Sequence, residues 1–184
     1  MRQITVGITG ASGAIYAQRL LQRLHTLREV EVAVVVSDCG EQVFRHELGD
    51  EALAAIPFRR YANNDFTAPF ASGSSRFDTL IVAPCSMGAL ARIAHGTADT
   101  LLARTADVML KERRRLILVT REAPLSLIHL RNMVRVTEAG GVICPAAPAF
   151  YSRPATIAEA VHSVTDRILQ LAGLDDGRLF RWNG

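Results

Sequence analysis

The first sixteen residues constrain the fold of this 184-residue chain more than any other stretch. A short apolar run, residues 4–8, stops at the small residues Gly10, Ala11, Ser12 and Gly13, and a helical pattern follows at once. In an α/β protein this order predicts a strand, a tight turn and the exposed N-terminus of a helix, where free N–H groups and the helix dipole favour an anion. The spacing, Gly-x-x-Gly-x-x-Gly, differs from the Gly-x-Gly-x-x-Gly dinucleotide fingerprint. The stretch therefore predicts a phosphate site for a nucleotide of unspecified kind.

Strand and helix signals alternate along the whole chain. This alternation predicts an α/β fold of the Rossmann-like kind, a doubly wound and mostly parallel sheet, in one domain over residues 1–184. Asp99 is expected to cap a helix, and residues 62–75 to form a polar loop. Apolar and β-branched runs predict strands at 4–8, 30–36, 58–61, 79–83, 116–120 and 142–144, and amphipathic spacing predicts helices at 14–27, 39–48, 87–95, 100–112, 126–139 and 156–172.

Ligands bind doubly wound sheets at the carboxyl ends of the strands. Five small or charged polar clusters follow expected strands in this chain and should gather at one edge of the sheet. They are residues 9–13, Ser37, residues 86–89, the pair Arg121 and Glu122, and the turn before Tyr151.

Composition and residue spacing argue against several classes of protein. No apolar run reaches the roughly 18 residues of a membrane span, and glycines interrupt the apolar start, so neither a membrane protein nor a signal peptide is expected. Cys39, Cys85 and Cys144 are widely spaced, which favours reduced thiols and a cytoplasmic location. The five histidines lack ligand spacing, so no metal is expected. The net charge of +3 arises from dispersed arginines, which argues against nucleic-acid binding.

Two of the clusters carry groups suited to phosphate binding and acid–base chemistry. Ser86, Met87 and Gly88 repeat the order of the opening turn, although an ordinary serine N-cap gives the same pattern. Arg121 can pair with a phosphate through two N–H groups, and Glu122 can act as a general acid or base if it is partly buried. A solvated pair worth ~0–1 kcal/mol is the alternative. The place of the pair at the sheet edge favours a function.

Arg104 and Lys111 share one face of the helix expected at 100–112, because they are seven residues apart. Lys111 is the only lysine among 21 basic residues, which suggests a site where a guanidinium does not fit. Asp107 lies on the same face, so a solvated stripe with an Asp–Lys pair explains the spacing equally well. The spacing alone does not decide between these interpretations.

The remaining candidates are single residues with weaker signals. Tyr151 and Arg167 can both donate to an anion, although a packed ring and a surface charge are more common. Phe66 can stack on a flat or isoprenoid ligand, or simply anchor its loop. The chain lacks a Gly-Lys-Ser/Thr phosphate loop and a Gly-x-Ser-x-Gly nucleophile elbow. The residues by themselves therefore predict a flat phosphorylated cofactor, FMN in preference to NAD, beside a second anion site.

Six segments, in order along the chain, closely resemble the UbiX-type flavin prenyltransferases. They are 7–16 (GITGASGAIY), 64–75 (NDFTAPFASGSS), 83–88 (APCSMG), 104–114 (RTADVMLKERR), 121–124 (REAP) and 145–151 (PAAPAFY), and the match extends to the tail at Arg181 and Trp182. The resemblance implies a flavodoxin-like Rossmann fold and a homo-oligomer, usually a dodecamer, with active sites at subunit interfaces. It also implies transfer of a dimethylallyl group from dimethylallyl monophosphate to N5 and C6 of reduced FMN, without a metal. The prenylated FMN would serve a partner UbiD-type decarboxylase.

The resemblance also assigns roles to particular residues. It implies that Glu122 assists departure of the phosphate, that Ser12 helps proton transfer at the flavin and that Lys111 acts on the phosphate. Phe66 replaces a tryptophan that some members carry, so it would cover the prenyl group with a smaller ring. Residues matched to FMN binding are Gly10, Ala11, Ser12, Ser37, Ser86, Met87, Gly88, Ala89 and Arg121. Residues matched to the prenyl-phosphate pocket are Tyr151, Arg167, Lys111, Arg104 and Glu47.

Two other functions compete with prenyl transfer. An FMN-dependent cysteine decarboxylase of the phosphopantothenoylcysteine type resembles this chain in fold, but carries a Pro-x-Met-Asn substrate clamp. Here Asn132 and Met133 stand in the opposite order and lack the proline. A non-catalytic FMN carrier would not need a second anion site.

Overall fold

The computed structural model describes residues 1–174 and residue 177. Six strands form one sheet in the order β3-β2-β1-β4-β5-β6, and every neighbouring pair is parallel. This is the Rossmann strand order, in which the chain reverses direction across the sheet between β1 and β4. The strands are β1 (Arg2–Ile8), β2 (Val30–Val36), β3 (Arg59–Ala62), β4 (Phe77–Cys85), β5 (Arg115–Thr120) and β6 (Val142–Ile143).

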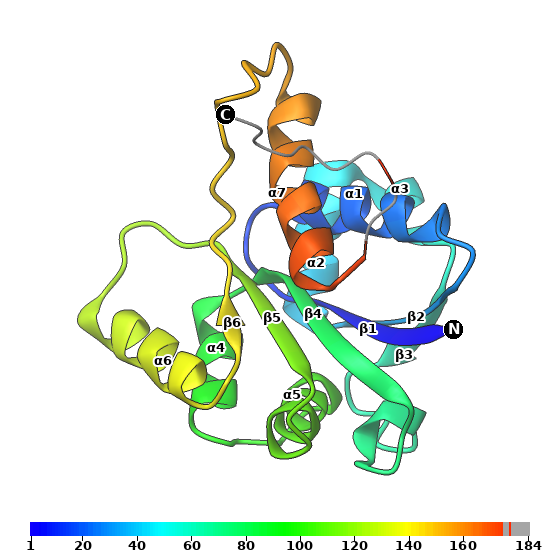
Figure 1. Ribbon diagram of the computed structural model, residues 1–184, viewed down its shortest axis with the longest axis vertical. Coiled ribbons are helices and arrows are strands. Elements are labelled where there is room, and N and C mark those ends of the chain that lie inside the picture. Colours follow the sequence, from blue (N-terminus) through cyan, green and yellow to red (C-terminus); the bar gives the residue numbers. More distant parts are fainter. Residues whose placement is uncertain (175–176, 178–184) are drawn as a thin grey trace.

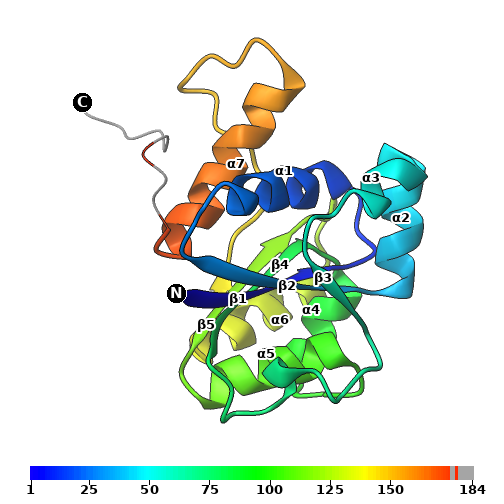
Figure 2. The same cartoon turned by 90° about the vertical axis from the view of Figure 1, so that its right-hand side faces the viewer.

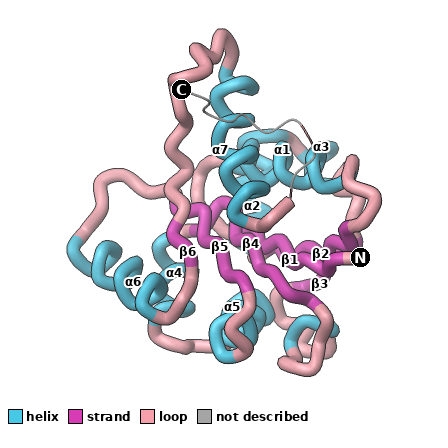
Figure 3. Tube along the Cα trace, in the orientation of Figure 1, coloured by secondary structure: helices cyan, strands magenta, loops and turns pink. Residues whose placement is uncertain are grey.

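Helices cover both faces of the sheet, as Figure 2 shows from the side and Figure 3 in tube form. One layer contains α1 (Ala14–His25), α2 (Asp38–Leu48), α3 (Asp50–Ala54) and α7 (Ile157–Leu171). The other contains α4 (Met87–Ala94), α5 (Leu101–Lys111) and α6 (Leu127–Glu138). The expected doubly wound α/β fold is confirmed.

Alternation along the strands divides the core between the two faces. Ile4, Val6 and Ile8 of β1 are buried in the cluster under α1 and α7, whereas Leu80 and Val82 of β4 belong to the cluster under α4 and α5. Because side chains of a strand point to alternate faces, a strand covered on both sides must be apolar at every position. This explains the continuous apolar runs in the sequence.

The structure departs from the expected elements at two places near the carboxyl edge. Thr100, not Asp99, is the N-cap of α5, and its Oγ1 accepts from the N–H of Ala103 at 3.3 Å. Asp99 instead pairs with Arg92. The short α3 was not expected, because five residues carry too little periodicity to indicate a helix.

Figure 1 shows that the connections after β1, β2, β4 and β5 all leave the sheet at one edge. The expected convergence of the polar clusters at this edge follows from the parallel topology. Within the described residues no helix is long and apolar enough to cross a bilayer. The expectation for Arg181 and Trp182 lies outside the described residues.

Candidate active site

A cavity of about 430 Å³ opens at the carboxyl ends of β1 and β4, where the connections after the two strands lead to opposite faces of the sheet; it is called the switch-point cavity below. Its size lies within the range of small-molecule sites, roughly 300–1,000 Å³. The residues that line it come from the ends of β1, β2, β3 and β4, from the first turns of α2 and α5, and from α4. Five residues predicted to bind FMN are among them, namely Gly10, Ser37, Ser86, Gly88 and Ala89.

Two helix N-termini offer hydrogen-bond donors to this cavity. Ser37 caps α2 by accepting from the N–H of Gly40 at 3.0 Å, and Ser86 caps α4 by accepting from the N–H of Ala89 at 3.3 Å. Within the described residues, the N–H groups of the two intervening residues of each helix have no hydrogen-bond partner. Unpaired N–H groups in a first turn suit an anion.

The N-terminus of α5 also borders the cavity, but its donors are already used. Asn63, at the end of β3, accepts from the N–H of Leu101 through its carbonyl at 2.7 Å and from that of Leu102 through Oδ1 at 3.0 Å. Thr100 satisfies the next N–H. An anion in the cavity would therefore be held by α2 and α4, not by α5.

Thr9 joins the two halves of the cavity. Its hydroxyl donates to the carbonyl of Pro84 at 2.8 Å and accepts from the N–H of Ser86 at 2.8 Å, and only 4% of the residue is exposed. A buried hydroxyl that satisfies two backbone groups fixes their separation. Thr9 thus positions the cap of α4 against the end of β1, a role that its place beside the glycines does not reveal in the sequence.

The opening turn lies close to α2, which explains its small residues. A Cβ at Gly10 would stand 2.6 Å from Cβ of Cys39, and one at Gly40 would stand 2.5 Å from the carbonyl oxygen of Ile8. Neither contact can be relieved without moving backbone. The start of α2 therefore packs directly on the end of β1.

The N-terminus of α1 is capped by a side chain from another helix. Glu47, near the end of α2, accepts from the N–H of Gly13 at 3.0 Å and from that of Ala14 at 2.7 Å. Gly13 itself has a left-handed backbone, with φ of 112°. The anion that the sequence predicts at this N-terminus is therefore the chain's own Glu47 carboxylate.

Glu47 is also the centre of a charged cluster. Burial acts to raise its pKa, but hydrogen bonds from the Ser12 hydroxyl and the two backbone N–H groups, together with the charge of Arg121, lower the pKa below its usual value of 4.5. Arg121 also acts on the phenol of Tyr16, whose pKa burial nevertheless raises. Ser12, Glu47 and Arg121 thus come together, as the resemblance implied, with Tyr16 added.

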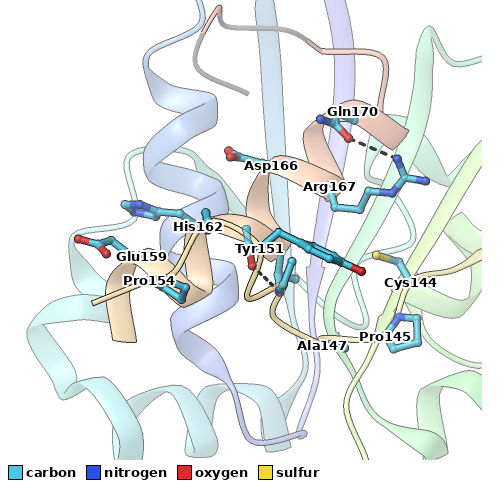
Figure 4. Close-up of a pocket in the computed structure, with 14 residues that line it drawn as sticks. Cys144, Pro145, Ala147, Tyr151, Pro154, Glu159, His162, Asp166, Arg167 and Gln170 are labelled. Atoms are coloured by element: carbon cyan, nitrogen blue, oxygen red, sulfur yellow. Dashed lines mark hydrogen bonds between the residues drawn. The ribbon is translucent and has the colours of Figure 1, made fainter. Parts of the chain in front are cut away.

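A second cavity, of about 700 Å³, lies between α7 and the segment that follows β6; it is called the α7 cavity below. Figure 4 shows the ring of Tyr151 and the side chain of Arg167 in its wall, beside Cys144. Arg167 Nη1 donates to Oε1 of Gln170 at 3.3 Å. Burial raises the pKa of the Cys144 thiol, and the Arg167 charge opposes that shift. Tyr151 and Arg167 are therefore brought together, as predicted.

Arg121 and Glu122 lie between the two cavities, because β5 separates β4 from β6 in the sheet. The Glu122 side chain is exposed, and its Oε1 accepts from the adjacent N–H of Ala123 at 3.1 Å. The partial burial on which an acid–base role of Glu122 depends is thus not present in a single chain. An acid–base role for Glu122 requires something else to cover it.

Arg104 and Lys111 lie apart from the other candidates. Arg104 pairs with Asp107 at 2.6 Å and donates from Nε to the carbonyl of Ala71 at 3.1 Å. Lys111, at the far end of α5, pairs with Glu112. The alternative of an Asp107–Lys111 pair is therefore wrong, since Asp107 bonds to Arg104 instead.

The remaining predicted residues are Ala11, Met87 and Phe66. The side chains of Ala11 and Met87 are buried, and that of Met87 belongs to the core cluster under α4 and α5. Phe66 is 48% exposed in the loop after β3. Within the described residues no three histidine, cysteine or carboxylate side chains are grouped as metal ligands.

The comparisons with known proteins agree with this geometry. The family model described as Flavoprotein matches residues 1–172. A probable UbiX-like flavin prenyltransferase of Bacillus subtilis (strain 168) is 45% identical over 99% of this chain and 90% of its own length. The crystal structure of AnUbiX (PadA1) in complex with FMN and dimethylallyl pyrophosphate has a TM-score of 0.94 at 47% identity, covering 100% of this chain and 98% of that chain. The dodecameric FMN-dependent UbiX-like decarboxylase from Escherichia coli O157:H7 has a TM-score of 0.94 at 42% identity, covering 99% of this chain and 100% of that chain.

Fold, cavities and family model together define a Rossmann-like flavoprotein. At this level of identity over the full chain, the protein belongs to the UbiX flavin prenyltransferase family. A PPC decarboxylase structure, 19% identical with a TM-score of 0.62, covers 80% of this chain and 83% of that chain and shares the fold alone.

Proposed function

We propose that this chain transfers a dimethylallyl group from dimethylallyl monophosphate to reduced FMN. Two cavities along the carboxyl edge of one sheet, with Arg121 between them, carry this proposal. The switch-point cavity offers the first-turn N–H groups of α2 and α4 to a phosphorylated flavin. The α7 cavity offers Tyr151 and Arg167 to a second phosphate. The family to which the chain belongs supports the same reaction.

The flavin side is suited to FMN by its donors. Reduced FMN, when bound, supplies the nucleophilic atoms N5 and C6 that accept the prenyl carbons. Gly10 lines the cavity, and the hydroxyls of Ser37 and Ser86, which accept from their own helices, keep a proton to donate. Ala11, Met87, Gly88 and Ala89 would contact the flavin through backbone.

The donor side is suited to a departing phosphate. When the C–O bond of the donor breaks, the phosphate leaves with both bonding electrons, and negative charge grows on its oxygens. A guanidinium and a phenol hydroxyl placed there, those of Arg167 and Tyr151, stabilise that charge. We assign the proton delivered to the leaving oxygen to Glu122, at the end of β5.

Ser12 and Glu47 form the proton-handling pair on the flavin side. Because its pKa is lowered, the Glu47 carboxylate stays ionised near neutral pH and accepts from the Ser12 hydroxyl. An oriented hydroxyl can pass a proton in a defined direction. Ser12 is assigned that transfer, and Arg121 holds Glu47 in its charged form.

We propose that Lys111 and Arg104 enter the active site of a neighbouring copy of the chain, and that this neighbour also covers Glu122. In one chain Lys111 is at the end of α5 that is remote from the switch-point cavity, so it can reach an active site only in another subunit. The outer face of α6 exposes Leu127, Ile128 and other apolar side chains, which a monomer would leave in water. We propose a homo-oligomer, and a dodecamer fits the assembly of the Escherichia coli structure.

The wider assignments follow from the reaction. We propose that the prenylated FMN is passed to a UbiD-type decarboxylase, as the family resemblance implies. Cys39, Cys85 and Cys144 form no disulfide with one another, which favours a reducing cytoplasm. The cysteine decarboxylase alternative is disfavoured because Asn132, which would belong to its substrate clamp, is buried in α6.

The direct test is anaerobic incubation of the protein with reduced FMN and dimethylallyl monophosphate, followed by mass spectrometry of the extracted flavin. Gain of one C5 unit, dependent on the protein, is the expected result. No gain with either the monophosphate or the pyrophosphate donor would refute prenyl transfer. A matched incubation with a cysteine-terminated peptide, scored for loss of carbon dioxide, tests the alternative.

A further inference from the structure

Arg92 is the one basic side chain among the described residues that line the switch-point cavity. It lies on α4 and its side chain runs back toward the start of that helix, where Nη1 is 3.4 Å from the carbonyl oxygen of Gly88. Its Nε is 3.4 Å from Oδ2 of Asp99, and about half of the side chain is exposed. Arg92 belongs to none of the motifs in the sequence and to none of the residues matched to FMN binding in the family.

The bonds that hold Arg92 are weak. Both distances lie beyond the usual 2.7–3.2 Å range of N–H···O hydrogen bonds. Within the described residues Nη2 of Arg92 has no hydrogen-bond partner. The guanidinium therefore keeps donors for a ligand and can turn toward one at little cost.

The cation stands next to an anion site that lacks another positive charge. The N–H groups of Met87 and Gly88, at the start of α4, have no partner among the described residues, and Arg92 reaches the same helical turn. Asp38 also lines the cavity and would repel a dianion. A phosphate held here needs a nearby cation to offset that carboxylate, and Arg92 is in place to provide it.

We propose that Arg92 binds the 5′-phosphate of the flavin and makes the site prefer FMN to riboflavin. The inference rests on the proposed flavin site and adds a residue and a selectivity to it. Arg121, by contrast, contacts the Glu47 cluster on the other side of the opening turn, so the two arginines serve different parts of the site.

The test compares the affinities of two flavins that differ only in the phosphate. Dissociation constants of FMN and riboflavin are measured by flavin fluorescence for the wild type, Arg92→Gln and Arg92→Lys. Arg76→Gln is the matched control, because it removes the same charge from an exposed residue just before β4, at the end of the strands away from the cavity. Arg92→Gln should weaken FMN about tenfold, the low end for a charge-assisted hydrogen bond on a half-exposed group.

Riboflavin should bind Arg92→Gln as it binds the wild type, and Arg92→Lys should keep part of the preference for FMN. Equal weakening of both flavins would show a structural role and overturn the proposal, as would unchanged binding of FMN. If Arg76→Gln weakened FMN binding as much as Arg92→Gln, the loss would reflect the net charge of the protein, and the proposal would be overturned. Prenyl transfer is scored separately on the wild type, so failure of that reaction is not confused with failure of the phosphate contact.

Discussion

Lys111 and Glu122 should act in the same active site from different chains. Thr100 borders the switch-point cavity, and Lys111 lies eleven residues further along the axis of α5. At 1.5 Å per residue the helix carries Lys111 about 16 Å from that edge, farther than a lysine side chain can return. Its ion pair is with the next residue, Glu112, and so lies at the same far end of the helix. Removing Lys111 and Glu122 from separate chains therefore tests how the site is assembled.

The assay coexpresses Lys111→Ala and Glu122→Gln chains with different affinity tags and purifies the mixed oligomers through both tags. Each variant alone should lose most prenyl transfer, because one side of every site is incomplete. In random mixed oligomers about a quarter of the sites combine an intact Lys111 from one chain with an intact Glu122 from another, so about a quarter of wild-type turnover should return. If both residues came from the same chain, no site would be intact. Mixed oligomers as inactive as the parents would refute the shared site.

Three further predictions concern single residues. Glu122→Gln should keep FMN binding but lower kcat by about 10²–10⁴-fold, the usual contribution of a general acid, and unchanged turnover would remove Glu122 from the mechanism. Glu47→Gln should lower the free energy of unfolding by roughly 1 kcal/mol at pH 7, discounted for exposure, because the lowered pKa of Glu47 contributes stability above its usual value of 4.5. That difference should shrink as pH falls and Glu47 protonates, and urea titrations that show a constant difference down to about pH 3 would contradict the cap. Thr9→Val should lower the free energy of unfolding by about 1–3 kcal/mol and weaken FMN binding, whereas Thr9→Ser should keep both near their wild-type values. An unchanged melting temperature for Thr9→Val would contradict the proposed role of the Thr9 hydroxyl in joining Pro84 to Ser86.

The fold could be predicted from the sequence because the four central strands, β1, β2, β4 and β5, are covered on both faces. An apolar run such as 30–36, flanked by helical patterns, predicts a buried strand of a parallel sheet. The sheet in turn predicts that ligands bind at the carboxyl ends of its strands. Cap positions were less certain, because Asp99 and Thr100 are both good caps and only packing decides between them. Adjacent capping residues compete within a few tenths of a kcal/mol, roughly the spread of the cap scale.

The site was harder to predict where contacts join distant parts of the chain. Glu47 caps α1 from a position 34 residues away, and no spacing rule relates the two. Its place in the pocket came from family resemblance alone. Asn63 and Thr9 each make two hydrogen bonds to residues far away in the sequence, and sequence patterns do not report such contacts. Arg92 carried no signal, since an arginine on an exposed helix face is ordinary.

The two cavities are built from different parts of the chain, and this affects how each can change. The switch-point cavity is bordered by the N–H groups at the starts of α2 and α4, which persist through most substitutions, and by Gly10, which permits few. The wall of the α7 cavity consists of side chains on one helix and one loop, Tyr151 and Arg167 among them. In the function proposed above the α7 cavity holds the prenyl donor, so mutational drift there would alter the length or shape of the donor while flavin recognition is kept. In such a protein the two substrates are separately adjustable, and laboratory evolution toward longer donors should collect its changes on α7 and the segment before it.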